Sequence, residues 1–295
     1  MNVAVVTDST AYLPPDLAAR HHVRVVPLHV VIAGRSYEEG RDISSADVAQ
    51  ALRSYRPVST SRPSPSAFLE VYRELAGGGA DHVVSVHISG EMSATAGSAE
   101  LAAADSPVPV TVVDSRSIGM AMGFAVLAAA EAAAADATPA TVAQVALDHA
   151  AAASVGFYVD TLEYLRRGGR IGKAAALFGS ALAIKPLLTM RDGQIEPLER
   201  VRTTSRALAR MRERAVEAAM AVDAAEGVDI AVHHLDSRER AEQLVQALAH
   251  AVPHARRVLL VELGAVVGAH VGPGTLATAV SPRGTGRSRI LGASD

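Results

Sequence analysis

The chain has 295 residues, of which 49% are hydrophobic and 20% are charged, and its net charge is -3. This length favours two domains, and the composition indicates a globular protein with an apolar core rather than a disordered one. The near balance of charges argues against a broad surface for nucleic acid or anionic membranes. Because the sequence has no cysteine, it excludes disulfides, thiolate metal sites and cysteine catalysis.

We expect a cytoplasmic protein with no integral membrane association. The first ten residues, MNVAVVTDST, have neither the basic nor the apolar region of a signal peptide. No stretch reaches the roughly 18 apolar residues that a membrane-spanning helix needs. The Ala-rich segment 120–135 is shorter than that and only weakly apolar.

In the first half of the chain, β-branched runs alternate with helical patterns. The predicted strands are 3–7, 24–32, 82–88 and 110–114, and the predicted helices are 14–20, 45–54, 66–76, one from about 93, 118–135 and 139–153. Residues 57–66, PVSTSRPSPS, are rich in Pro and Ser, which predicts a loop. Alternating strands and helices favour a mostly parallel sheet covered on both faces. We therefore predict an N-terminal α/β/α sandwich over residues 1–155.

The second half has a different order of elements, which predicts an α+β domain over residues 156–281. The predicted elements are a strand at 156–162, a Gly/Arg turn at 166–173, a hairpin about Asp192-Gly193, a helix at 203–225, a strand at 228–234, a helix at 237–250 and apolar runs at 257–263 and 266–271. Residues 282–295 carry three arginines among Gly and Ser and are predicted to be a disordered tail.

Several familiar sites are disfavoured by residue spacing. In RRGGRIGK (166–173), a phosphate-binding loop would need glycine at Arg167 and a hydroxyl residue at Ala174. GPGTLA (272–277) lies too near the end of the sequence to open a dinucleotide-binding unit. The adjacent His233 and His234 would face opposite sides of a strand, and we expect no metal site and no cofactor. A Ser/His hydrolase using Ser93 and His270 lacks the nucleophile-elbow motif.

Hydroxyl-rich loops follow several predicted strands. These loops are VTDST (6–10), STSRPS (59–64), HISGEMSAT (87–95) and VVDSRS (112–117). Ligands of parallel sheets bind beyond the carboxyl ends of the strands, and a helix N-terminus attracts anions. Ser93 and Thr95 therefore lie where a carboxylate or phosphate would be held, although helix capping would account for each loop equally well.

These segments, together with LRRGGRIG (165–172), IKPLLTMRDGQI (184–195) and GAHVGPGTL (268–276), resemble the DegV family from residue 3 to about 280. The resemblance implies a two-domain α/β protein that binds a long-chain fatty acid and serves a separate, ATP-using fatty acid kinase subunit. It implies that the carboxylate is bound by Thr60 and Ser93, with Ser61 as an additional contact. His270 would support these hydroxyls, and Arg170 would supply positive charge.

The resemblance also implies that Arg202 contacts the kinase subunit. Three positions depart from the family pattern: Arg62 stands where Gln is usual, Ala94 where Gly is usual and Ala96 where Tyr is common. The apolar stretch 174–188 is a candidate wall for the acyl chain, and core packing between the domains is an equal alternative.

We expect a non-catalytic carrier that holds one fatty acid between its domains and presents the carboxyl group to the kinase. Two alternatives remain open: a regulatory or scaffold protein that binds lipid without a kinase partner, and a Ser/His acyl hydrolase. No nucleic-acid partner is expected.

Overall fold

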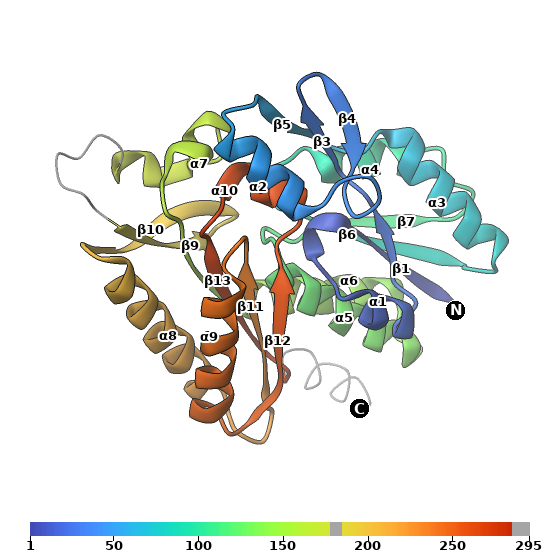
Figure 1. Ribbon diagram of the computed structural model, residues 1–295. Coiled ribbons are helices and arrows are strands. Elements are labelled where there is room, and N and C mark those ends of the chain that lie inside the picture. The colour runs from blue at the N-terminus through green and yellow to red at the C-terminus, as the bar shows by residue number, and fades with distance from the viewer. Residues whose placement is uncertain (178–184, 285–295) are drawn as a thin grey trace. The chain divides into compact units, whose positions relative to one another are not determined.

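The computed structural model describes residues 1–177 and 185–284. The chain forms two compact units (Figure 1). The first contains residues 1–28, 62–152 and the described residues from 283 onward, and the second contains residues 29–61 and 153–282. The crossing at 152/153 lies close to the predicted boundary at 155. Residues 29–61, which the prediction assigned to the N-terminal domain, pack with the second unit instead.

The first unit is built on a four-stranded parallel sheet of order β2-β1-β6-β7. Its strands are β1 (Val3–Asp8), β2 (Arg24–Val26), β6 (His82–His87) and β7 (Val110–Asp114). Its helices are α1 (Pro15–Arg20), α3 (Pro65–Gly77), α4 (Thr95–Ala103), α5 (Met120–Ala134) and α6 (Pro139–Ala152), and the 3-10 turn η1 (Ser9–Ala11) follows β1. This arrangement confirms the predicted parallel α/β sheet.

Both faces of this sheet are covered, as the alternation of its apolar side chains requires. Val5 and Val84 belong to a core that includes residues of α5 and α6. Their neighbours Val6 and Val83 point the other way and pack with Phe68 of α3 and residues of α4. The carboxyl ends of the strands carry the loops that follow Asp8 and His87.

The second unit contains a six-stranded mixed sheet of order β10-β9-β8-β13-β11-β12. Its strands are β8 (Ser154–Tyr158), β9 (Lys185–Arg191), β10 (Gln194–Val201), β11 (Val228–His234), β12 (Ala255–Glu262) and β13 (Leu276–Pro282). Only β11 and β12 pair in parallel among these described strands. The helices α8 (Thr204–Met220) and α9 (Arg238–Ala251) contribute to the apolar core on this sheet.

The predicted hairpin about Asp192-Gly193 is confirmed. Asp192 has φ +51° and Gly193 has φ +80°, which is the two-residue left-handed turn that matches the twist of an antiparallel pair. The pairing of β9 with β10 begins directly outside this turn, at Arg191 and Gln194.

A smaller antiparallel sheet of order β4-β3-β5 completes the second unit. It consists of β3 (His29–Ile32), β4 (Arg35–Glu38) and β5 (Val58–Ser61). The helices α2 (Ser45–Arg53), α7 (Glu163–Arg167) and α10 (Ala265–Val271) and the 3-10 segment η2 (Gly172–Leu177) belong to the same unit. α10 packs against α2, α7, β3 and β5.

Two local predictions were wrong. Residues 24–32 are not one strand: Pro27, which has no N–H for a ladder, separates β2 from β3, and these strands belong to different sheets. Residues 57–66 are not a loop throughout, because Val58–Ser61 form β5 and pair with β3. Pairing with a distant strand outweighed the local Pro and Ser content.

Among the described residues we find no helix with the length and apolarity of a membrane span. Residues 178–184, the central part of the candidate acyl-chain wall, lie outside the described residues, and so do residues 285–295 of the predicted tail.

Candidate functional site

The second unit contains a cavity of about 490 Å³. This volume lies within the usual range for small-molecule sites. Its walls come from the β3–β4 turn, from α2 and the segment that follows it, from α7 and its Gly turn, and from α10. The lining residues are Val31, Ala33, Gly34, Leu52, Tyr55, Arg56, Pro57, Val58, Ser59, Thr60, Tyr164, Arg167, Gly168, Arg170, Ala269 and His270.

Positive charge dominates the cavity wall. Arg56, Arg167 and Arg170 line it, and none of the lining residues is acidic. Arg167 forms an ion pair with Glu163. The guanidinium of Arg170 donates to the carbonyl oxygen of Gly168 at 2.6 Å. An anion is therefore the charge complement of this cavity.

Thr60 and His270 meet in the cavity wall although 210 residues separate them in the sequence. Thr60 Oγ1 lies 2.9 Å from His270 Nε2. β5 positions Thr60 through its pairing with Val30 of β3, and α10 positions His270 near its C-terminal end. When Nε2 carries the imidazole proton, it donates to Thr60 Oγ1, and the hydroxyl proton of Thr60 is then available to an acceptor in the cavity.

His270 is held in its neutral form. Burial, with a smaller contribution from the nearby charge of Arg170, lowers the pKa of His270 to about 4. Its Nδ1 atom is buried and has no hydrogen-bond partner among the described residues. In the Ser-His-Asp hydrolases a carboxylate orients this nitrogen, and no group does so among the described residues, so the geometry does not favour the hydrolase alternative.

Two glycine-bearing segments pack against each other at this site. A Cβ atom on Gly168 would lie 2.1 Å from His270 Nδ1, so the imidazole ring packs directly on the glycine backbone. Gly272, at φ +77°, likewise leaves room for Tyr164, whose Cδ2 would be 2.1 Å from an added Cβ. The GGRI and HVGPG motifs are therefore complementary in shape as well as adjacent in space.

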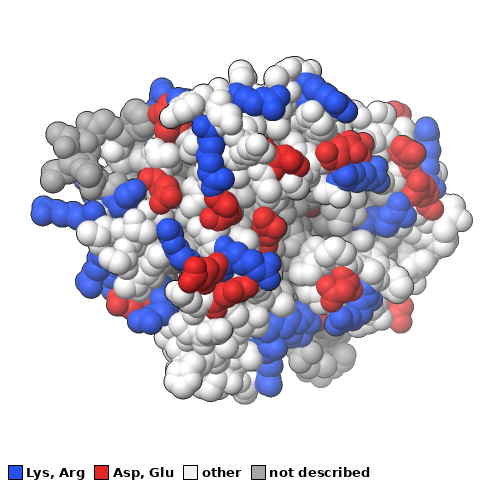
Figure 2. All heavy atoms as spheres, viewed as in Figure 1, with Lys and Arg blue, Asp and Glu red and all other residues white. Residues whose placement is uncertain are grey.

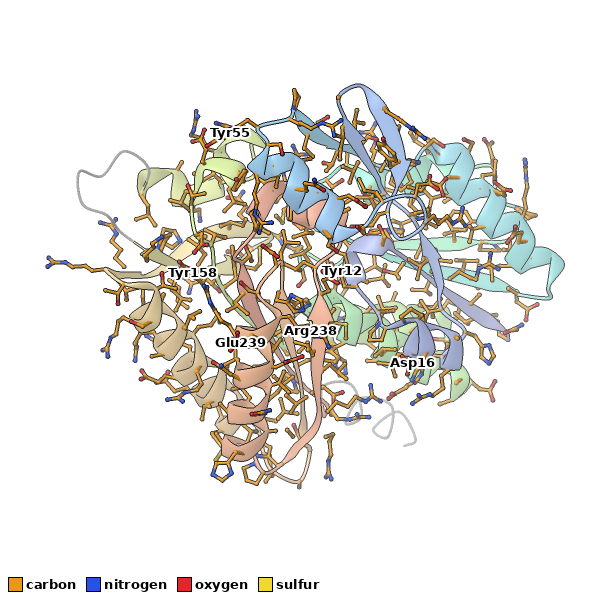
Figure 3. The ribbon with its side chains drawn as sticks, in the orientation of Figure 1. Tyr12, Asp16, Tyr55, Tyr158, Arg238 and Glu239 are labelled. Atoms are coloured by element: carbon orange, nitrogen blue, oxygen red, sulfur yellow. The ribbon has the colours of Figure 1, made fainter. Side chains whose placement is uncertain are left out.

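The other predicted site residues of the second unit, Ser61 and Arg202, take no part in the contact between Thr60 and His270. Ser61 follows Thr60 on β5, so its side chain faces the opposite side of the strand, and it is exposed. Arg202 is exposed between β10 and α8, immediately before Thr203, whose hydroxyl caps α8. The roles assigned to Ser61 and Arg202 stay predictions. Tyr55, which the sequence analysis did not single out, lines the cavity and is 85% exposed (Figure 3).

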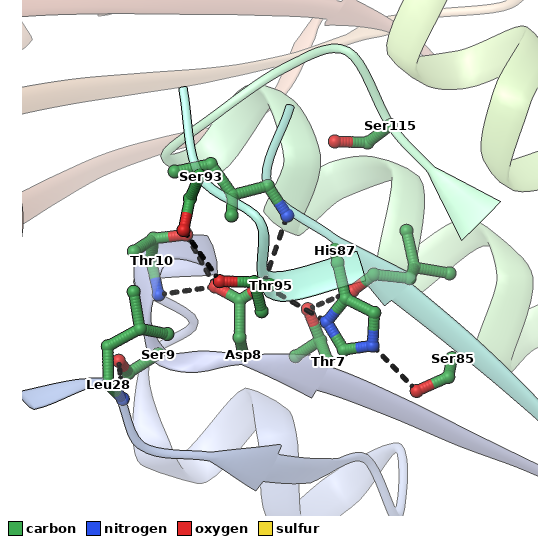
Figure 4. A network of polar contacts seen from close by, with 12 residues as sticks. Thr7, Asp8, Ser9, Thr10, Leu28, Ser85, His87, Ser93, Thr95 and Ser115 are labelled. Atoms are coloured by element: carbon green, nitrogen blue, oxygen red, sulfur yellow. Dashed lines mark hydrogen bonds and ion pairs between the residues drawn. The ribbon is translucent and has the colours of Figure 1, made fainter. Parts of the chain in front are cut away.

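Ser93 belongs to the first unit, in the loop between β6 and α4 (Figure 4). Its Oγ lies 2.8 Å from Oγ1 of the buried Thr95. The N-cap residue of α4 is Ala94, and it forms no side-chain capping bond. The Ser93 hydroxyl is therefore not used as a helix cap, and its role toward a ligand stays a prediction.

Ala94 causes no backbone conflict at the position where glycine is usual in the family. It has φ -79° and ψ 28°, which an L-residue adopts without the strain of the left-handed region. Ala96 is buried in the first turn of α4.

Three buried polar residues were missed by the sequence reasoning. Asp8 and His87 are fully buried at the ends of β1 and β6, where they contact each other. Glu39 is buried in the second unit and accepts a hydrogen bond from the backbone N–H of Val266 at 2.7 Å, near the start of α10. The available signal was a polar residue that interrupts or ends an apolar strand, as in VAVVTD and HVVSVH.

No cluster of three metal-ligating side chains occurs among residues 1–177 and 185–284. Lys173, the residue at the lysine position of the rejected phosphate loop, lies 2.5 Å from Glu196 in an ion pair. Figure 2 shows acidic and basic side chains interleaved over the face in view, with no single broad field of one sign.

Comparison with known proteins places these features in a family. The model described as "Uncharacterised protein, DegV family" matches residues 2–283. A DegV domain-containing protein of Streptomyces coelicolor is 54% identical over 96% of this chain and 99% of its own length. Protein DegV of Bacillus subtilis is 35% identical over 94% of this chain and 98% of its own length.

Solved structures agree over nearly the whole chain. One from Thermus thermophilus, reported as fatty acid binding of a DegV family protein, has a TM-score of 0.86 and 37% identity and covers 96% of this chain and 100% of that chain. DegV from Bacillus subtilis, reported as a fatty acid binding protein, has a TM-score of 0.87 and 32% identity over 96% of this chain and 99% of that chain. The chain therefore belongs to the DegV family.

Proposed function

We propose that this protein binds one long-chain fatty acid and that Thr60 binds its carboxylate, with His270 and Arg170 in support. The observation that supports this most directly is the Thr60–His270 pair beside Arg170 in a cavity without acidic lining residues. The similarity to proteins reported to bind fatty acids supports the choice of anion.

The chemistry of the three residues suits a carboxylate. With its ring proton on Nε2, a neutral His270 donates to Thr60 Oγ1 and leaves the Thr60 hydroxyl proton for a carboxylate. Arg170 supplies charge without a proton that titrates near neutral pH. Burial of an unpaired carboxylate would cost several kcal/mol. Donors that are already oriented by Gly168 O and by β5 reduce this cost, because less side-chain freedom is lost on binding.

The acyl chain would provide most of the gross binding free energy. Transfer of about 16 carbons out of water at about 0.8 kcal/mol per methylene contributes roughly 12 kcal/mol before the losses of ligand freedom are subtracted. The carboxylate contacts would then select the class of lipid and orient it.

A titration of the purified, lipid-free protein with palmitate tests this assignment. Replacing Thr60 with Val keeps the shape of the side chain and removes the hydroxyl, so we expect about tenfold weaker binding. Thr111→Val is the matched control, because Thr111 also pairs with a histidine, His82, at 2.9 Å but belongs to the first unit. Equal palmitate affinity in the two variants would contradict the role of Thr60.

We propose further that the bound fatty acid is the substrate of a separate ATP-dependent kinase subunit. There, a carboxylate oxygen would attack the γ-phosphorus of ATP, the bond to the β-phosphate oxygen would break, and acyl phosphate and ADP would form. The exposed Arg202 would contact an acidic surface of that subunit.

Reconstitution with a fatty acid kinase catalytic subunit and ATP tests the partner. We expect acyl phosphate from the wild-type protein, and a lower rate from Arg202→Glu at unchanged palmitate affinity. Absence of acyl phosphate with every wild-type preparation would favour a lipid-binding regulatory protein instead.

A further inference from the structure

A line of hydrogen bonds runs through the interior of the first unit. The Tyr72 hydroxyl donates to Ser85 Oγ at 2.9 Å, Ser85 Oγ lies 2.7 Å from His87 Nε2, and His87 Nδ1 lies 3.1 Å from Asp8 Oδ2. All four side chains are fully buried. Figure 4 shows the part of this line formed by Ser85, His87 and Asp8.

The direction of the hydrogen bonds in this line follows from its first donor, Tyr72. Burial raises the pKa of Tyr72 to about 12, so its hydroxyl keeps its proton and donates to Ser85. We infer that the hydroxyl proton of Ser85 is directed at His87 Nε2, which then acts as the acceptor. In this arrangement the proton of the ring lies on Nδ1 and donates to Asp8 Oδ2.

Asp8 connects the ends of two neighbouring strands. Its Oδ1 accepts from the backbone N–H of Thr10 at 3.0 Å and from the Thr10 hydroxyl at 2.5 Å. Its Oδ2 accepts from His87 and from the backbone N–H of Ile88 at 3.0 Å. These four bonds use the acceptor sites of the carboxylate and hold the carboxyl end of β6 against that of β1.

The loop that carries Ser93 is built directly on this end of β6. Ser89 follows Ile88, and its carbonyl oxygen accepts the backbone N–H groups of Met92 and Ser93, both at 3.0 Å. The backbone N–H of Ser89 donates to Ser117 O at 3.0 Å. A shift of Ile88 would therefore move Ser89 and, through the hydrogen bond to its carbonyl oxygen, Ser93.

We propose that the Asp8–His87–Ser85 network positions the Ser93 loop for ligand binding. This inference rests on the proposed function, because it gives the Ser93 loop a part in the fatty acid binding that the family resemblance implies for Ser93. The three residues have the hydrogen-bond order of a hydrolase triad. Ser85 nevertheless lies within β6 and is fully buried, so it cannot meet a substrate.

Two substitutions of His87 separate its two hydrogen bonds. Asn places an amide nitrogen near the position of Nδ1, so His87→Asn keeps the donor to Asp8 and loses the contact with Ser85. Gln places its amide near the position of Nε2, so His87→Gln keeps an acceptor for Ser85 and leaves Asp8 without its donor. His82→Asn is the matched control, since His82 bonds Thr111 at the other end of the same strand.

The measurement is the palmitate dissociation constant of each full-length variant, together with its unfolding midpoint. We expect His87→Gln to bind about tenfold more weakly and His87→Asn to stay within about threefold of wild type. His82→Asn should match wild-type affinity even where its unfolding midpoint falls. Equal affinities of the two His87 variants would overturn the positioning role while the proposed function stands.

A wild-type protein that binds no palmitate would instead overturn the proposed function, and the positioning role with it. Should the His87 variants fail to fold, Ser85→Ala provides the test. Nitrogen-15 NMR of the imidazole should show the Nδ1–H form in the wild type. In Ser85→Ala we expect more of the Nε2–H form and weaker palmitate binding in parallel. A wild-type ring protonated on Nε2 would overturn the proposal.

Discussion

Gly168→Ala is expected to displace the His270 ring and weaken ligand binding. Gly168 has φ -74° and ψ -8°, so alanine fits its backbone and the whole effect is steric. The new Cβ would lie 2.1 Å from His270 Nδ1, which forces the ring to rotate away from Thr60. Overpacking costs about 1–3 kcal/mol and the lost hydrogen bond about 1 kcal/mol, so the expected loss of stability is about 2–4 kcal/mol.

Gly169→Ala is the matched control for this substitution. Gly169 has φ +68° and no atom within 4 Å of an added Cβ, so alanine there costs about 1–2 kcal/mol of backbone strain without touching the ring. Denaturant unfolding and palmitate titration of both variants separate the two effects. Gly168→Ala should lose stability and at least tenfold in affinity, whereas Gly169→Ala should lose stability alone. A Gly168→Ala protein with wild-type affinity would refute the role given to the His270 ring.

Three further changes have defined outcomes. Burial lowers the pKa values of His270 and His233 to about 4. Between pH 6.5 and 4 the unfolded chain therefore binds more protons than the folded chain, so the free energy of unfolding should fall as the pH is lowered through that window. An unfolding midpoint that stays constant from pH 7 to 4.5 would contradict this. Glu39→Gln should weaken the capping of α10, and it should reduce palmitate affinity because α10 carries His270. Wild-type palmitate affinity in this variant would contradict the prediction. Arg170→Gln should bind a fatty acid about tenfold more weakly but a fatty alcohol equally well, and equal loss for both ligands would refute a charge effect.

Some of the regular elements of the fold follow from local pattern. β1 and β6 were predictable because β-branched residues make up four of the six positions of β1 and three of the six of β6. The Asp192-Gly193 hairpin was predictable because its two residues adopt positive φ readily. β5 was not predictable from Val58–Ser61 alone, since its strand conformation depends on pairing with β3. The assignment of residues 29–61 to the second unit is likewise decided by contacts distant in the sequence.

The candidate site was predictable only in part. Thr60, Arg170 and His270 were named from a family resemblance, and the structure brings them to one cavity. No local pattern could have shown that Gly168 accommodates the His270 ring, because that contact joins segments about 100 residues apart. Asp8 and His87 escaped notice because each reads as an ordinary polar end of a strand, and only the register of β1 with β6 brings them together.

The central claim is that the protein carries a fatty acid, and native mass spectrometry of the purified protein tests it most directly. We expect a mass increment equal to one long-chain fatty acid, confirmed by extraction and identification of the released lipid. A lipid-free mass that persists after incubation with palmitate and with oleate would contradict the claim.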